Sequence, residues 1–180
     1  MIETKRLLLK PAHPDLAGEV LAYYLRNREF LRPFEPERDP EFYTLERQAE
    51  TLREQAQAAE NGSSYCFYLF SKEESKMLGS VSLSNLVRFS FQSCFLGYKL
   101  DEKNQRRGYM TEAVCAVTDF AFGELGLHRV EANVMPRNKA SLRVLEKAGY
   151  REEGLARKYL KINGVWEDHI HMVRLNENQP

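Results

Sequence analysis

The chain has 180 residues, 43% of them apolar and 29% charged, so it is long enough for one well-packed domain and excludes a disordered or low-complexity class. Its 26 basic and 26 acidic residues balance, which gives no general attraction to nucleic acid or to an anionic membrane. Three scattered cysteines (Cys66, Cys94, Cys115) without a CxxC pair argue against a zinc site or a disulfide framework. We therefore expect one domain over residues 1–180, in the cytoplasm, without a metal or a membrane partner.

The first predicted elements are a strand at Leu7 to Leu9 and a helix opened by Pro14. The segment LRPFEPERDP follows, and its prolines exclude a regular helix or a central strand. Thr44 is the predicted N-cap of a second helix, which ends at Asn61-Gly62.

The middle of the chain is predicted to form three strands, Tyr65 to Phe70, Lys76 to Leu86 and Cys94 to Leu100. A loop, QRRGYM, leads from the third strand into a helix that runs from Thr111 to about Leu125. The loop therefore lies between a strand end and a helix start.

The carboxy-terminal part is predicted to contain a strand, a short helix and two further strands. A strand is predicted at Arg129 to Val134, and Asn138 caps a short helix closed by Gly149. Two final strands, 157–162 and 165–174, flank Asn163-Gly164, a strong type I′ hairpin signal. The order of elements predicts an α/β domain with a mixed sheet.

The loop before Thr111 carries the main chemical signal. A helix start presents free N–H groups to an anion, Gly108 permits close approach, and Lys103, Arg106 and Arg107 add positive charge. The pattern is neither a Walker loop nor GxGxxG, which disfavours a nucleoside triphosphate or a dinucleotide as the ligand. A pyrophosphate group of another ligand would fit the loop. Residues 137–151 carry a net charge of +4 (five basic, one acidic), and residues 28–60 carry −4 (five basic, nine acidic). We expect an anionic ligand near the first and a cationic partner near the second.

The stretches LGYKLDEKNQRRGYMTEAV and HRVEANVMPRNKASLRVLEKAGY resemble the GNAT family of acetyl-CoA-dependent N-acetyltransferases. With TKRLLLKP, NREFLRPFEPERD and KYLKINGVWEDH, the resemblance extends over nearly the whole chain to ribosomal-protein-alanine N-acetyltransferases of the RimJ/RimL type, closest to RimJ. It implies the GNAT acyltransferase fold, an α/β (α+β) domain with a central, mixed, mostly antiparallel sheet of about seven strands flanked by helices.

The resemblance also implies a coenzyme site. The loop from Gln105 to Met110 would wrap the pyrophosphate, the strand at 98–100 would pair with the pantetheine arm, and Asn138 and Ser141 would contact that arm. Family members often have a tyrosine that acts as the general acid at the position of Leu145. The leucine here cannot donate a proton, so another donor is needed. The full set of expected coenzyme contacts is Tyr98, Lys99, Leu100, Gln105, Arg106, Arg107, Gly108, Tyr109, Met110, Thr111, Asn133, Asn138 and Ser141.

Acetyl transfer to an amine needs a neutral amine and a proton for the departing thiolate. About 10% of an α-amine with a pKa near 8 is already neutral at pH 7, so a weak base suffices. Glu112 is the predicted base, expected to turn away from the phosphates toward the acceptor, and Glu131 is the alternative. Ser141 or Tyr159 is the predicted acid, whereas Cys115 has no neighbouring base that would make it a nucleophile.

The acceptor is expected to be a protein amino terminus, held by Phe34, Glu35 and Glu37 with Asn85 near a strand end. The predicted function is direct transfer of acetyl from acetyl-CoA to the α-amine of a ribosomal protein that begins with alanine. Two alternatives remain: a small amine such as a polyamine or aminoglycoside, and acyl-CoA binding without catalysis. The sequence leaves the oligomeric state open.

Overall fold

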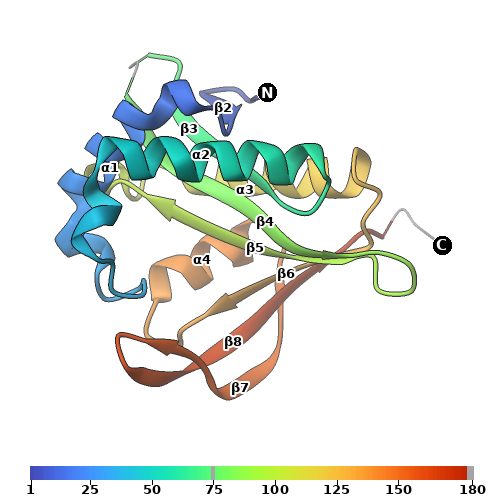
Figure 1. The fold of residues 1–180 in the computed structure, drawn as a ribbon. Coiled ribbons are helices and arrows are strands. Elements are labelled where there is room, and N and C mark those ends of the chain that lie inside the picture. The colour runs from blue at the N-terminus through green and yellow to red at the C-terminus, as the bar shows by residue number, and fades with distance from the viewer. Residues whose placement is uncertain (74–75, 178–180) are drawn as a thin grey trace.

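The computed structural model describes residues 1–73 and 76–177, so residues 178–180 of the predicted domain lie outside it. Within these residues one eight-stranded sheet lies between two pairs of helices (Figure 1). The strands are β1 (Ile2–Glu3), β2 (Leu7–Pro11), β3 (Tyr65–Ser71), β4 (Met77–Val87), β5 (Ser93–Leu100), β6 (Arg129–Val134), β7 (Arg151–Ile162) and β8 (Val165–Leu175). The helices are α1 (Ala17–Leu31), α2 (Leu45–Glu60), α3 (Tyr109–Gly123) and α4 (Lys139–Lys147), with short 3₁₀ helices at Pro14–Leu16, Pro40–Tyr43 and Glu102–Asn104.

The strand order across the sheet is β1-β2-β3-β4-β5-β6-β8-β7, and every neighbouring pair is antiparallel except β5 with β6. The predicted mixed, mostly antiparallel sheet is therefore confirmed. The expected number of about seven omitted β1, a two-residue strand that exists because it pairs with Leu8 and Leu9. Such a short strand has no periodic pattern of its own in the sequence.

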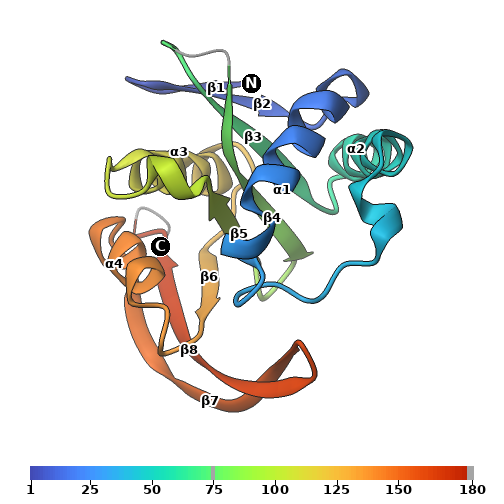
Figure 2. The ribbon, with the colours of Figure 1, turned by 90° about the vertical axis from the view of Figure 1, so that its left-hand side faces the viewer.

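The helices cover the two faces of the sheet in pairs (Figure 2). Helices α1 and α2 pack with β3 and β4 around a smaller core that includes Tyr23 and Leu52. Helix α3 lies on the opposite face, where Val114 and Val117 join the main core, and Leu145 of α4 belongs to the same core. The apolar stripe predicted from Met110 through Val114 and Val117 is buried along its length.

The two parallel strands β5 and β6 separate within the sheet. They pair only where Ser93 to Phe95 lies opposite Arg129 to Glu131. Beyond that point β5 continues to Leu100 and β6 continues to Val134, and the two strands diverge toward their carboxyl ends (Figure 1). We call this opening the wedge. Its β5 side is five residues long, roughly 16 Å at the usual rise of a strand.

Local signals position the elements that border the wedge. Asn138 caps α4 by accepting a hydrogen bond from the Ser141 amide at 3.1 Å, as predicted. Gly149 ends that helix at φ 84°, and the turn between β7 and β8 has positive φ at both Asn163 and Gly164 (48° and 83°), as a type I′ hairpin requires. Helix α3 begins at Tyr109, two residues earlier than expected, because Gly108 adopts φ 80° and lets the chain turn into the helix at once.

Candidate active site

The basic loop, residues 101–108, connects the open end of β5 to α3. Its first residue, Asp101, is only 1% exposed and accepts hydrogen bonds from Arg26 Nε at 2.5 Å and from the Lys103 amide at 3.0 Å. Burial acts to raise the pKa of Asp101, but the hydrogen bonds from Arg26, Asn27 and Lys103 and the charge of Arg26 lower it below its usual value. A buried, charged anchor therefore fixes where the loop starts.

The rest of the basic loop is free to receive an anion. Arg106 and Arg107 are exposed, and Gly108 places the first amides of α3 at the mouth of the wedge. A Cβ added to Gly108 would lie 3.3 Å from Arg6 Nη2, so a larger residue would crowd this approach. Met110 is buried in the core, which leaves its backbone N–H as its polar contribution at the helix start. The expected pyrophosphate contacts are thus gathered at one place.

Glu112 is bound by the amino-terminal segment of the chain. Its carboxylate accepts hydrogen bonds from Thr4 Oγ1 at 2.6 Å, the Arg6 amide at 2.8 Å and Arg6 Nε at 2.7 Å. Partial burial acts to raise the pKa of Glu112, but these hydrogen bonds and the Arg6 charge lower it below its usual value. These contacts leave the carboxylate weakly basic and give it a structural function, so they do not support the predicted base role.

A hydroxyl pair spans the α3–α4 side of the wedge. Tyr98 on β5 lies with its Oη 2.7 Å from Oγ of Ser141, in the first turn of α4, and donates at 3.1 Å to the Ser141 carbonyl in one of its two hydrogen-bond arrangements. Burial raises the pKa of Tyr98 above its usual value, although the Ser141 hydrogen bond opposes the shift. The predicted acid is thus placed against a second, neutral hydroxyl.

The other face of β5 points toward α1. Side chains alternate along a strand, and Cys94 and Leu96 face the core with α3, so Lys99 faces the opposite side. Its ammonium donates to Tyr24 Oη at 3.0 Å and forms an ion pair with Glu35. Burial acts to lower the pKa of Lys99, but Tyr24 and Glu35 raise it above its usual value. Lys99 is therefore a cation, bound to the segment predicted to hold the acceptor.

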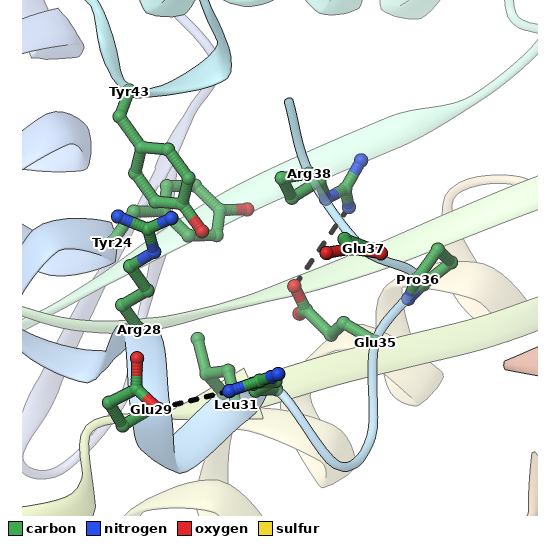
Figure 3. Close-up of a pocket in the computed structure, with 10 residues that line it drawn as sticks. Tyr24, Arg28, Glu29, Leu31, Glu35, Pro36, Glu37, Arg38 and Tyr43 are labelled. Carbon is green, nitrogen blue, oxygen red and sulfur yellow. Dashed lines mark ion pairs between the residues drawn. The ribbon is translucent and has the colours of Figure 1, made fainter. Parts of the chain in front are cut away.

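That proline segment, residues 32–39, borders a cavity of about 210 Å³ (Figure 3). Glu35 and Glu37 both line it, and Glu35 is also 3.9 Å from Arg38. Phe34, 36% exposed, is adjacent in the chain but is not part of the lining. Asn85 lies apart from these residues, because its β4 neighbour Ser84 pairs with Phe95 at the closed end of the wedge. Two of the four predicted acceptor residues, Glu35 and Glu37, therefore line the cavity.

The proline segment connects the two sides of the wedge. It reaches β5 through Glu35 and Lys99, and it reaches the loop after β6 through Arg137, which donates to the Pro33 carbonyl at 3.3 Å and pairs with Glu167 at 2.6 Å. The β7–β8 hairpin adds a bond from Asn163 Nδ2 to the Arg32 carbonyl at 2.8 Å. An irregular segment is thus held across one face of the wedge.

The β6 side of the wedge carries a polar group without a partner. Asn133 Oδ1 is buried and has no hydrogen-bond partner among the residues that the structure describes. Unpaired buried oxygens are costly, so this atom is suited to a donor from a bound molecule. Tyr159, the other predicted acid, lies farther along the sheet, with its ring 5.0 Å from that of His171.

Comparison with known proteins identifies the fold and the chemistry. The acetyltransferase (GNAT) domain family matches residues 6–151. The chain belongs to the GNAT acetyltransferases. The chain is 44% identical to "Probable N-acetyltransferase YjcK" of Bacillus subtilis over 176 residues, covering 98% of this chain and 97% of that protein.

Two further relatives carry more specific names. The [Ribosomal protein uS5]-alanine N-acetyltransferase of Escherichia coli is 37% identical over 169 residues, covering 94% of this chain and 87% of that protein. The solved structure of Mycobacterium smegmatis RimJ, in complex with CoA-disulfide, superimposes with a TM-score of 0.90 at 26% identity, covering 97% of this chain and 84% of that one. The predicted GNAT fold and the resemblance to RimJ are confirmed.

Several contacts of this GNAT site were not anticipated from the sequence. Arg6 donates to the Arg107 carbonyl at 2.8 Å and stacks over the Tyr109 ring at 4.6 Å, so the amino-terminal segment braces the basic loop. The bonds from Lys99 and Arg137 to the proline segment were also missed. In each case the partners lie 60 to more than 100 positions apart, and no local pattern in the sequence joins them.

Within the described residues no cluster of three His, Cys, Asp or Glu side chains has the arrangement of a metal site, and no helix is long and apolar enough to cross a membrane. Burial raises the pKa of the Cys115 thiol, although Arg174 opposes the shift. This thiol is therefore less ionised than usual, in agreement with direct transfer rather than an acyl-cysteine intermediate.

Proposed function

We propose that this N-acetyltransferase transfers acetyl from acetyl-CoA to the N-terminal α-amine of a protein, and specifically of a ribosomal protein that begins with alanine. The observation that carries the proposal is the wedge, with the basic loop at its open end and the acidic proline segment across one face. The relatives named for uS5 alanine acetylation and for RimJ support the acceptor class. A protein of this kind would act in the cytoplasm.

The residues around the wedge suit acetyl-CoA as the cosubstrate. The end of the basic loop and the start of α3, from Gln105 to Thr111, offer backbone amides and two exposed arginines to the pyrophosphate. The unpaired edge of β5 from Tyr98 to Leu100 offers peptide groups to the pantetheine amides, and Asn133 offers an unsatisfied oxygen. Asn138 and Ser141 border the same space from α4. Acetyl-CoA supplies the activated acetyl group.

The side chains of this chain would serve three tasks in the transfer. Glu35 and Glu37 attract the cationic amino terminus of the acceptor. Tyr98 positions the Ser141 hydroxyl, which protonates the thiolate as it leaves. Tyr159, on the opposite face of the sheet from Ser141 and close to His171, is better placed to contact the acceptor than the thiolate.

The decisive experiment measures thiol release from acetyl-CoA with three acceptors: a peptide with a free amino-terminal alanine, the same peptide with a blocked terminus and an added lysine, and spermidine. We expect turnover with the first peptide alone, because its α-amine is partly neutral at pH 7. Turnover with spermidine alone would assign the enzyme to small amines. Coenzyme binding without thiol release for any acceptor would contradict catalysis altogether.

A further inference from the structure

A polar cluster formed by Glu131, His171 and their neighbours lies at the closed end of the wedge, on the face of the sheet that carries the proline segment. Glu131 is the last residue of β6 that pairs with β5, and it lies opposite Phe95. The alternate β6 residues Val130 and Ala132 are buried in the main core with α3, so Glu131 faces the other side. This is the face that carries Lys99 and the proline segment.

Strand register brings His171 to the same face. His171 of β8 pairs directly with Asn133 of β6, two residues beyond Glu131. Directly opposed residues in an antiparallel pair project to the same side of the sheet. His171 therefore stands beside the diverging part of β6, next to the unsatisfied Asn133 oxygen.

The carboxylate of Glu131 is held in place by one neighbour and faces His171 with its remaining oxygen. Arg129 Nε lies 2.8 Å from Glu131 Oε1, and the same guanidinium binds Glu153 through two hydrogen bonds of 3.0 and 2.5 Å. Glu131 Oε2 is 3.8 Å from His171 Nδ1. A carboxylate fixed beside one ring nitrogen can orient an imidazole.

The imidazole also borders open space. It lines a surface depression of about 270 Å³ together with Glu153, Gly154 and Ala156, and Tyr159 packs edge-on against it. The titratable groups that face it are Glu131 from β6 and Glu153 and Tyr159 from β7. Behind them, Arg129 binds both carboxylates, and the His169 ring lies 5.8 Å from that of Tyr159. A proton taken up by the ring can therefore leave to solvent.

We propose that His171 is the base that accepts the proton of the acceptor amine, and that Glu131 is its positioning residue. The inference rests on the proposed acetyl transfer and deepens it. The imidazole first takes one proton from the ammonium group of the acceptor. The freed amine nitrogen then forms a bond to the acetyl carbonyl carbon while the carbon–sulfur bond breaks. The second nitrogen proton replaces the one that Ser141 or water gives to the departing thiolate. The proposal assigns the base to a side chain that lines a surface depression, whereas the Glu112 carboxylate is occupied by Thr4 and Arg6.

The test measures kcat/KM of His171→Gln for the alanine peptide between pH 7 and pH 9. We expect a loss of about 100-fold at pH 7, within the range of general base catalysis. The deficit shrinks toward pH 9, because the neutral fraction of an α-amine rises from roughly one tenth to roughly nine tenths. Glu131→Gln should show a smaller loss with the same pH trend, and the KM for acetyl-CoA should not change.

Two controls separate this role from a structural one. His128→Gln and Glu152→Gln remove an exposed imidazole and an exposed carboxylate outside the cluster and should retain activity within twofold. Added imidazole should restore part of the activity of His171→Ala, since the depression is open to solvent. An equal deficit at every pH, or no rescue by imidazole in a folded variant, would overturn the inference.

A failure of the His171 assignment can be distinguished from a failure of the proposed function. If the unmodified enzyme acetylates spermidine instead of the peptide, the proposed acceptor fails, and the same His171→Gln profile measured with spermidine still decides whether His171 is the base. If the unmodified enzyme releases no thiol with any amine, both proposals are overturned.

Discussion

At the scale of single residues, the Tyr98 and Ser141 hydroxyls decide where one proton points. Tyr98 has one proton to donate, and both the Ser141 carbonyl and its Oγ lie within reach. If Tyr98 donates to Oγ, the serine proton is free to be given away. If Tyr98 donates to the carbonyl, the serine proton points back to the phenol. Tyr98 therefore controls whether Ser141 can serve as the acid.

Replacing Tyr98 by Phe should lower kcat about tenfold with little change in the KM for acetyl-CoA, because proton donation loses its positioning partner. The lost hydrogen bond should cost about 1 kcal/mol of unfolding free energy. Steady-state kinetics of Tyr98→Phe, Ser141→Ala and the double variant form a cycle in which the effects should not be additive. Tyr65→Phe, on β3, is the matched control. Fully additive losses would contradict coupling between the two hydroxyls.

Glu112→Gln should act on stability more than on chemistry. Hydrogen bonds to a charged group contribute about 1.5–3 kcal/mol, and Glu112 accepts three from Thr4 and Arg6. Because folding lowers the pKa of Glu112, its stabilisation is fully present above the unfolded pKa of about 4.3 and is lost as the pH falls through the lower folded value.

Denaturant unfolding of Glu112→Gln should therefore show a deficit at pH 7 that shrinks below about pH 4. Glu124→Gln, at the other end of α3, should change stability by no more than about 0.5 kcal/mol. Unchanged stability combined with a large fall in kcat for the peptide would instead restore Glu112 as a base.

At the scale of elements, the proline segment owes its shape to neighbours rather than to its own backbone preference. Prolines remove donors and prevent a regular ladder, so the segment depends on bonds from side chains. The β7–β8 hairpin provides one of them at its tip, where Asn163 meets the Arg32 carbonyl. The type I′ turn therefore has a second role, which is to place an amide donor against the acceptor segment.

Asn163→Gly separates these two roles. Glycine accepts the positive φ of the turn, so the hairpin should remain folded, whereas the donor to Arg32 is lost. We expect the KM for the alanine peptide to rise several-fold while the affinity for acetyl-CoA stays the same. Asn61→Gly, which precedes Gly62 at the end of α2, is the matched control. An unchanged peptide KM would show that the hairpin does not support the acceptor site.

At the scale of the whole molecule, the sheet is joined at its centre by the three residue pairs between β5 and β6. A ligand inserted in the wedge would contact both halves and bind only the folded state. At 100 times its dissociation constant such a ligand stabilises a protein by about 2.7 kcal/mol.

Acetyl-CoA should accordingly raise Tm by about 5–10 °C at that concentration. Hydrogen exchange should slow at residues 96–100 and 132–134 more than in α2. Inorganic pyrophosphate, which offers charge without a pantetheine arm, should raise Tm less. Equal effects of the two ligands would contradict binding along the wedge.

Local sequence signals were enough to predict many of the helix caps, turns and buried faces of this protein. The caps at Thr44, Asn138 and Gly149 and the turn at Asn163-Gly164 were correct because capping and turn chemistry act within a few residues. The buried stripe of α3 was correct because periodicity reflects one buried face. The short β1 was missed because its pairing with β2 is what makes it a strand.

The sequence by itself therefore determined all four α-helices, every strand except β1, their order and the basic loop, since these depend on neighbours along the chain. Only the tertiary structure decided where the side chains point. It turned Glu112 toward Thr4 and Arg6, joined Lys99 to Glu35, and set Glu131 beside His171. The physical reason is that strand register and the separation of β5 from β6 bring together residues far apart in sequence, and no local preference encodes such contacts.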